Sequence, residues 1–245
     1  MEKNADLNSE FLTAIQTSFN RFIESKTSRS PAKLKPLHGK IAKDLETKLG
    51  GGYKIWSQGY GEGREKKMAG KYMDKMVDIV IQNKKPEKDV AGIAVKFVMQ
   101  NYSQNSNNYF ENMLGETANI RSAGFRYFQV FVILDELPYY DDKKKIKKWE
   151  SFKQHNVEKY YKLSEDDPKQ SLHTPNMTLI YVVHVSPSLP RRAKKKSLYY
   201  KFYDRRKKEV TIDVSKENYD GFKSDGAVIL NDYTLFLNEV FNAIK

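Results

Sequence analysis

The sequence contains no cysteine, which excludes disulfide bonds and thiolate metal sites and favours a reducing compartment. No apolar run approaches the roughly 20 residues of a membrane-spanning helix, and the N-terminus lacks the apolar segment of a signal peptide. Acidic residues are also in deficit: 31 Asp and Glu stand against 43 Lys and Arg, giving a formal net charge of +12. We therefore expect a cytoplasmic protein with no membrane partner, whose basic surface attracts an anionic macromolecule.

Glycine gathers in one short segment, Gly59-Tyr60-Gly61-Glu62-Gly63. Neither the Lys-Ser/Thr pair of a phosphate-binding loop nor a dinucleotide-binding continuation follows it, so the sequence predicts no nucleotide cofactor. With 39% hydrophobic and 13% aromatic residues, a chain of 245 residues can build a substantial core. Because it shows no internal repeat and no flexible linker, we expect a single domain.

Apolar residues recur at helical spacing in five segments, as in the series Phe11, Ile15, Phe19, Phe22. The expected helices cover residues 7–25, 31–49, the amide-rich segment 100–108 onward to Ser122, about 144–162 and about 231–244. Short β-branched and aromatic runs predict strands elsewhere. The expected strands cover residues 53–58, 77–82, 91–99, 125–134 and 177–185, followed by a hairpin of 198–203 and 209–214.

This order of elements predicts an α/β fold with a central mixed β-sheet flanked by helices. The strand 91–99, the helix after it and the strand 125–134 form a βαβ crossover, so these two strands should be parallel. The nearly continuous apolar character of 125–134 is typical of a strand covered on both faces. Residues of about 187–215, which carry a run of Arg and Lys, are expected to form a basic hairpin elaboration on the domain.

Two neighbouring strands each carry one charged residue inside an apolar run: Asp78 in the first and Lys96 in the second. A buried charge is costly unless it has a partner or a metal. One interpretation is a buried ion pair with a structural role alone. The other is metal-dependent phosphodiester hydrolysis, in which the acid holds Mg²⁺ and the lysine orients a water molecule or neutralises developing charge.

The pattern Val77-Asp78, a spacer and Ala94-Val95-Lys96 resembles the P-D…(D/E)-x-K nuclease superfamily. Valine stands in place of the proline, and Ala94 stands where that motif has a glutamate. The amide-rich helix after the lysine makes the chain similar to type II restriction endonucleases, and especially to the subgroup in which this helix supplies the missing glutamate. The resemblance covers about residues 53–134 and implies a restriction-endonuclease-like fold.

The resemblance implies an enzyme that hydrolyses double-stranded DNA at specific sequences, with Mg²⁺ as cofactor and a homodimer as the assembly. The catalytic candidates are Asp78, Lys96, Glu111 and Glu116, with Asp78 and Glu111 as metal ligands. Fourteen residues separate Lys96 from Glu111, the spacing of the permuted subgroup, but both glutamates border the apolar stripe of the helix and periodicity does not choose between them. Glu62 or Glu65 could also reach the metal. A repair nickase, a junction resolvase and a non-catalytic DNA-binding module remain alternatives.

Amide and basic side chains are candidates for contact with DNA, because Asn and Gln pair with adenine and Arg with guanine. The residues chosen on this ground, or for phosphate contact, are Lys71, Gln104, Asn105, Asn107, Asn108, Asn119, Arg121, Arg191, Arg192, Lys194, Arg205 and Arg206. The amides could equally cap a helix in solvent, and the basic segment could be a charged edge that prevents aggregation. The four histidines do not cluster in sequence, and His184 is interpreted as a core residue of a buried strand.

Overall fold

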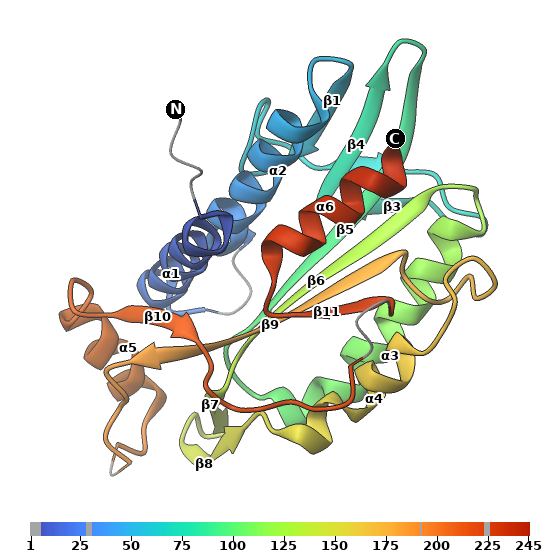
Figure 1. The fold of residues 1–245 in the computed structure, drawn as a ribbon. Helices are drawn as coiled ribbons and strands as arrows, with labels where there is room; N and C mark the ends of the chain where they lie inside the picture. The colour runs from blue at the N-terminus through green and yellow to red at the C-terminus, as the bar shows by residue number, and fades with distance from the viewer. Residues whose placement is uncertain (1–5, 28–30, 192, 223–225) are drawn as a thin grey trace.

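A computed structural model shows an α/β protein built on a central seven-strand mixed sheet with helices on both faces (Figure 1), which confirms the predicted fold class. The structure describes residues 6–27, 31–191, 193–222 and 226–245. The α-helices in these ranges are α1 (Leu7–Ser25), α2 (Lys35–Leu49), α3 (Tyr102–Arg121), α4 (Gln154–Ser164), α5 (Lys196–Arg205) and α6 (Tyr233–Ile244), with a 3-10 turn at Pro31–Leu34. No helix of the described ranges is both long and apolar enough to cross a bilayer.

The sheet runs in the order β1-β4-β5-β6-β9-β10, and β11 pairs with the first part of β9. Its strands are β1 (Tyr53–Ser57), β4 (Ile79–Lys84), β5 (Glu87–Val98), β6 (Arg126–Leu134), β9 (Met177–Ser186), β10 (Thr211–Val214) and β11 (Val228–Leu230). Two separate hairpins pair β2 (Lys66–Met68) with β3 (Lys75–Val77), and β7 (Glu136–Tyr140) with β8 (Ile146–Ser151). Strands β5, β6 and β9 are parallel, so the predicted βαβ crossover through α3 is confirmed.

Helices α1, α2 and α6 cover one face of the sheet, and α3 and α4 cover the other (Figure 1). The stripe predicted for α1 is buried, and Phe11 of this stripe stacks on Tyr233 with ring centroids 4.0 Å apart. Every residue of β6 after Arg126 is buried, as expected of a strand covered on both faces. The sheet is therefore packed between two layers of helices, which hold in place the side chains at the ends of its strands.

The prediction of a helix over 144–162 is wrong for the first half of this range. Residues Ile146–Ser151 form strand β8, which pairs antiparallel with β7, and the Ile146 N–H donates to the Lys194 carbonyl at 2.8 Å. The lysine run before Trp149 offers no apolar stripe, so partner strands rather than helical burial decide its conformation. Helical periodicity holds only from Gln154 onward, where Val157 and Tyr160 are buried in α4.

The basic hairpin predicted around 187–215 is also wrong. Residues 198–203 belong to helix α5, and β10 pairs with β9 instead of with them. Tyr199, Tyr200 and Tyr203 are all buried. Their spacing of one and then three residues places them on one side of a helix, whereas adjacent residues of a strand point to opposite faces.

Candidate metal centre and its surroundings

Asp78 was predicted inside a strand, but it lies in the single-residue gap between β3 and β4. The β4–β5 ladder begins at the pair Ile79–Ile93, so Val95, which pairs with Val130 of β6, has no partner in β4 on its other side. The Asp78 carboxylate replaces that partner by accepting a hydrogen bond from the Val95 N–H at 2.7 Å. Because Val95 directly precedes Lys96 in β5, this bond holds the Asp78 carboxylate close to the backbone of Lys96.

The environment of Asp78 disfavours its charge. Burial raises the pKa of its carboxyl group to about 6, the hydrogen bond from Val95 opposes that rise, and the negative charge of Glu116 adds to it. The positive charges of Lys96 and Lys75 lower the pKa again, but neither forms an ion pair with Asp78 in the described structure. The acid is therefore desolvated without a close cationic partner, a condition that is common at functional sites.

His38 and Glu65 meet Asp78 at this place. Each of the three residues offers a ligand atom, and these atoms all lie within 4.8 Å of one another. His38 is only 3% exposed and neither ring nitrogen has a hydrogen-bond partner, while burial lowers its pKa to about 4 and keeps the imidazole neutral. Burial, and then the charge of Asp78, raise the pKa of Glu65. Two carboxyl groups that repel each other thus face an unpartnered neutral imidazole.

His38 reaches this position because α2 lies directly against the loop that follows β1. A Cβ atom at Gly39 would be 2.4 Å from the Gly59 carbonyl oxygen, and one at Gly59 would be 1.9 Å from the Lys35 carbonyl oxygen. Only glycine at both positions allows this approach, which brings the first turns of α2 to the end of β1 and the start of β4. The sequence showed His38 next to Leu37 of the apolar stripe but gave no sign of its neighbours.

The donor set fits a divalent cation. Carboxylate oxygens and a neutral imidazole nitrogen are ordinary metal ligands, and a cation between Glu65 and Asp78 would relieve the repulsion between them. It would also give the buried His38 a partner, which a buried polar group otherwise lacks at a cost in free energy. Of the three ligands, Asp78 was predicted, Glu65 was one of the alternatives and His38 was missed.

Two lysines, Lys33 and Lys96, line one cavity. Lys96 is exposed on β5, with its ammonium 4.5 Å from the centroid of the Tyr109 ring. Lys33, from the 3-10 turn, is 9% exposed, and its pKa is lowered by burial and then by the charge of Lys96. Both lysines line a cavity of about 260 Å³ together with Asn105 and Tyr109. None of the three candidate ligands lines this cavity, and its link to the cluster is Lys96, whose positive charge lowers the pKa of Asp78.

The two candidate glutamates of α3 lie in different surroundings. Glu111 is exposed and its charge acts on Lys159 of α4. Glu116 forms an ion pair with Lys75 of β3, and its negative charge raises the pKa of Asp78. The structure therefore brings Glu116 rather than Glu111 to the side of Asp78. The role of either glutamate in metal binding stays a prediction.

The first turns of α3 keep most of the predicted DNA-contacting amides at the surface. Gln104, Asn107 and Asn108 are exposed, and Asn105 is half-buried at the cavity of Lys96. Gln104 also lines a second polar cavity, of about 300 Å³, whose basic members are Lys144, Lys147 and Lys196. Asn105 therefore lines one lysine-containing cavity and Gln104 the other, whereas Asn107 and Asn108 line neither.

Asn119 and Arg121 have hydrogen-bond partners inside the protein, and their contact with DNA stays a prediction. Asn119 is 9% exposed and its side chain hydrogen-bonds the backbone of the β2–β3 loop. The Arg121 guanidinium donates to the carbonyl oxygens of Ser171, Thr174 and Pro168. Sequence alone did not separate these polar residues from the exposed amides at the other end of the helix.

The predicted basic contacts near α5 are partly engaged by neighbours. Arg191 forms an ion pair with Glu136, and the Arg206 guanidinium lies 4.4 Å from the Phe202 ring centroid. Arg191, Lys194 and Arg205 are exposed, whereas Arg192 lies outside the described residues. Lys71, between β2 and β3, is exposed as well. Strand β10 lies at the opposite edge of the sheet from β1 (Figure 1), so α5 and its arginines are remote from Asp78.

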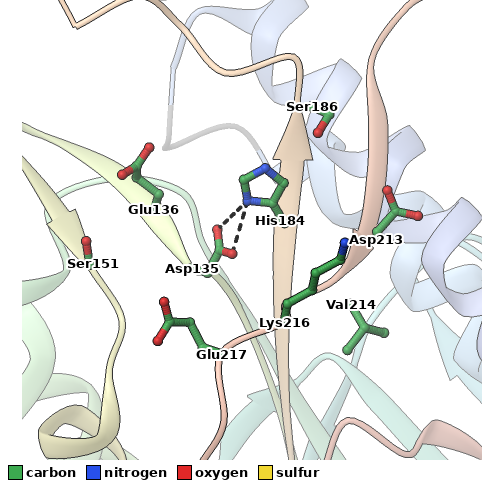
Figure 2. A pocket seen from close by; sticks show the side chains of 9 residues that line it. All are labelled: Asp135, Glu136, Ser151, His184, Ser186, Asp213, Val214, Lys216 and Glu217. Carbon is green, nitrogen blue, oxygen red and sulfur yellow. Dashed lines mark hydrogen bonds and ion pairs between the residues drawn. The ribbon is translucent and has the colours of Figure 1, made fainter.

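A separate cavity of about 780 Å³ lies where β6 and β9 end. Figure 2 shows His184 at its centre, with Nδ1 at 3.1 Å from both carboxylate oxygens of Asp135. Ser215 donates to the same carboxylate at 2.9 Å. His184 is 41% exposed in its side chain, so its assignment to the core is wrong. Because Asp213 and Glu217 also line this cavity, its charge is unfavourable for a phosphate, unlike that of the Lys96 cavity.

Comparisons of the chain with protein-family models, with curated proteins and with solved structures found no match.

Proposed function

We propose that the protein is a metal-dependent nuclease that hydrolyses phosphodiester bonds in double-stranded DNA. The observation that carries this proposal is the cluster of His38, Glu65 and Asp78, whose ligand atoms lie within 4.8 Å of one another. The positive charge of Lys96, which lines a cavity with Lys33, acts on Asp78 of this cluster. The net charge of +12 supports a polyanionic substrate. A type II restriction endonuclease acting as a homodimer is the finer form of the proposal, with a nickase or junction resolvase as the alternative.

The chain's own residues have separate tasks in this proposal. Asp78 and Glu65 supply negative ligands and His38 a neutral one, and the cation that they hold would provide Lewis-acid polarisation of the phosphate. Lys96 stabilises the negative charge that develops on the phosphate oxygens or orients the attacking water. Lys33 adds a second positive charge at the same cavity, which helps to position the phosphate before reaction.

The ligand types narrow the choice of metal. Carboxylates suit Mg²⁺ and Mn²⁺, whereas an imidazole binds transition metals more readily than it binds Mg²⁺. We therefore propose that Mg²⁺ supports the reaction and that Mn²⁺ binds more tightly. His38 is the residue on which this difference depends.

Incubation with supercoiled plasmid and Mg²⁺ or Mn²⁺, followed by gel electrophoresis, tests the proposal. We expect cleavage that Lys96→Ala lowers by about a hundredfold or more, because loss of one group that stabilises transition-state charge commonly costs this much. Lys43→Ala, which removes an exposed lysine of α2, is the matched control and should cut as wild type does. Discrete fragments favour a restriction endonuclease and open circles a nickase. The absence of cleavage with both metals over a range of salt would contradict the proposal.

The roles of the two α3 glutamates can be separated by replacing each with glutamine, which removes the negative charge and keeps the shape of the side chain. Glu116→Gln is expected to reduce cleavage, because Glu116 neighbours Asp78 and holds Lys75 of the adjacent strand. Glu111→Gln should leave cleavage close to wild type, since Glu111 is exposed toward α4. Initial cleavage rates at saturating metal measure both. If only Glu111→Gln is impaired, the permuted spacing is the better guide and the proximity of Glu116 to Asp78 has no catalytic meaning.

A further inference from the structure

The β2–β3 hairpin exposes apolar side chains to solvent at its tip, at Tyr72 and Met73, and on strand β3, at Met76. Tyr72 is 76% exposed, Met73 67% and Met76 51%. These three are half of the six exposed large hydrophobic residues in the described part of the chain, and they lie within five positions of one another. Single exposed apolar residues are ordinary, but such a cluster marks an interaction surface.

The tip is held in place by a buried side chain. The Asn119 side-chain oxygen accepts from the N–H groups of Tyr72 and Met73 at 3.0 and 3.3 Å, and its amide donates to the Met73 carbonyl at 2.8 Å. The Lys71 N–H donates to the Asn119 carbonyl at 2.9 Å, and a Cβ at Gly70 would lie 2.1 Å from the Asn119 amide nitrogen. The protein thus orders a loop whose own side chains are not buried, which is preorganisation for a partner.

The same hairpin carries two of the candidate metal ligands at its base. Glu65 immediately precedes β2 and Asp78 immediately follows β3. Figure 1 shows β3 on the side of the sheet that α3 covers, next to β4 and β5. Lys67 and Lys71 are exposed along the hairpin, and the Lys71 ammonium lies 5.5 Å from the Tyr72 ring centroid. A phosphate backbone bound at the base would therefore meet basic side chains along the hairpin and apolar ones at its tip.

We infer that this hairpin enters a groove of the duplex beside the scissile phosphate and wedges Tyr72 and Met73 against the bases. The inference rests on the proposed function and deepens it. A two-stranded β-ribbon fits a DNA groove, and apolar side chains that enter a groove unstack base steps. Lys67 and Lys71 contact the flanking phosphates. The positive charges around the tip favour DNA over a second copy of this chain, which is itself strongly basic.

The double variant Tyr72→Ser with Met73→Ser tests the wedge, because the hydrogen bonds to Asn119 use backbone atoms and are retained. Binding to a fluorescent duplex is measured by anisotropy without divalent metal, so that no cleavage interferes. We expect the affinity to fall by at least about tenfold, since contacts between such side chains and bases are commonly worth that much or more. Leu235→Ser, which changes an exposed residue of α6, is the matched control and should bind as wild type does.

A duplex with a base analogue that brightens on unstacking gives a second signal. Wild type and Leu235→Ser should raise its fluorescence, and the double variant should not. Lys71→Ala should reduce the salt dependence of binding by about one phosphate contact. Affinity and fluorescence change in the double variant equal to those of wild type would overturn the inference. Loss of a dimer in sedimentation, with DNA binding equal to that of wild type, would overturn it as well. If the tip matters for binding but no metal supports cleavage, the proposed function fails and the wedge stands.

Discussion

The Asp78→Asn substitution is expected to increase the free energy of unfolding of the metal-free protein at pH 8. Its effect at pH 8 should be more favourable than its effect at pH 3.5 by about 3 kcal/mol, because one pKa unit corresponds to about 1.4 kcal/mol. Burial raises the pKa of Asp78 from 3.8 to about 6 in the folded state. Between these two values the folded protein binds the proton more strongly than the unfolded chain does, so stability falls as the pH rises. Above about pH 6 the full cost of the buried charge is present, and asparagine removes it.

Urea unfolding of both proteins at a series of pH values between 3.5 and 8, with a chelator present, measures this difference. The asparagine of the Asp78→Asn variant can still accept the Val95 N–H through its amide oxygen, so the hydrogen bond, 2.7 Å long in wild type, need not be lost. Asp204→Asn, at an exposed position of α5, is the control and should change stability by less than about 0.5 kcal/mol at every pH. A stability difference between Asp78→Asn and wild type that does not vary with pH would show that Asp78 is not strained by its surroundings.

Functional sites are often destabilising, so that replacing one of their residues increases the stability of the fold. At Asp78 the cost has a visible origin, since burial and then the charge of Glu116 raise the pKa of its carboxyl group. Burial and then the charge of Asp78 also raise the pKa of Glu65 in the same cluster. An ion pair does not explain the arrangement, because Lys96 is directed to the Tyr109 ring instead of to Asp78. The interpretation of Asp78 and Lys96 as a plain structural ion pair is therefore the weaker one.

Much of the fold was predictable because local pattern and tertiary environment agree. The spacing of Phe11, Ile15 and Phe19 defined α1 to its observed bounds, and continuous apolar character defined β6 and β9. The failures came in short segments whose conformation depends on a distant partner. Strand β8 depends on β7, and the tyrosines of α5 pack against α1, as the contact of Phe19 with Tyr203 shows.

The candidate site was predictable only where a residue conflicts with its own segment. Asp78 stood out because a charge interrupts an apolar run, and Lys96 for the same reason. His38 gave no such signal, since a histidine beside an apolar stripe is ordinary, and its role depends on the close approach of α2 at Gly39 and Gly59. The choice between the α3 glutamates also needed tertiary structure.

Mn²⁺ at about 100 times its dissociation constant is expected to stabilise wild type by about 2.7 kcal/mol, which raises Tm by roughly 5–10 °C for a chain of this size. The metal binds the folded state, where His38, Glu65 and Asp78 are held together, and not the unfolded chain. Below about pH 6 a proton competes for Asp78, so the Tm shift should shrink as the pH falls. Thermal denaturation with and without Mn²⁺ measures it.

Variants at the ligands decide whether this stabilisation arises at the proposed place. Asp78→Asn should lose most of the Mn²⁺-dependent shift, although its metal-free Tm is higher at pH 8. His38→Gln should weaken the shift with Mn²⁺ more than the shift with Mg²⁺, because imidazole contributes more to binding the transition metal. His155→Gln, an exposed histidine of α4, is the matched control and should respond as wild type does. An equal Mn²⁺-dependent Tm shift in wild type and Asp78→Asn would show that the metal binds elsewhere. The chemistry proposed for the Asp78 cluster would then be contradicted.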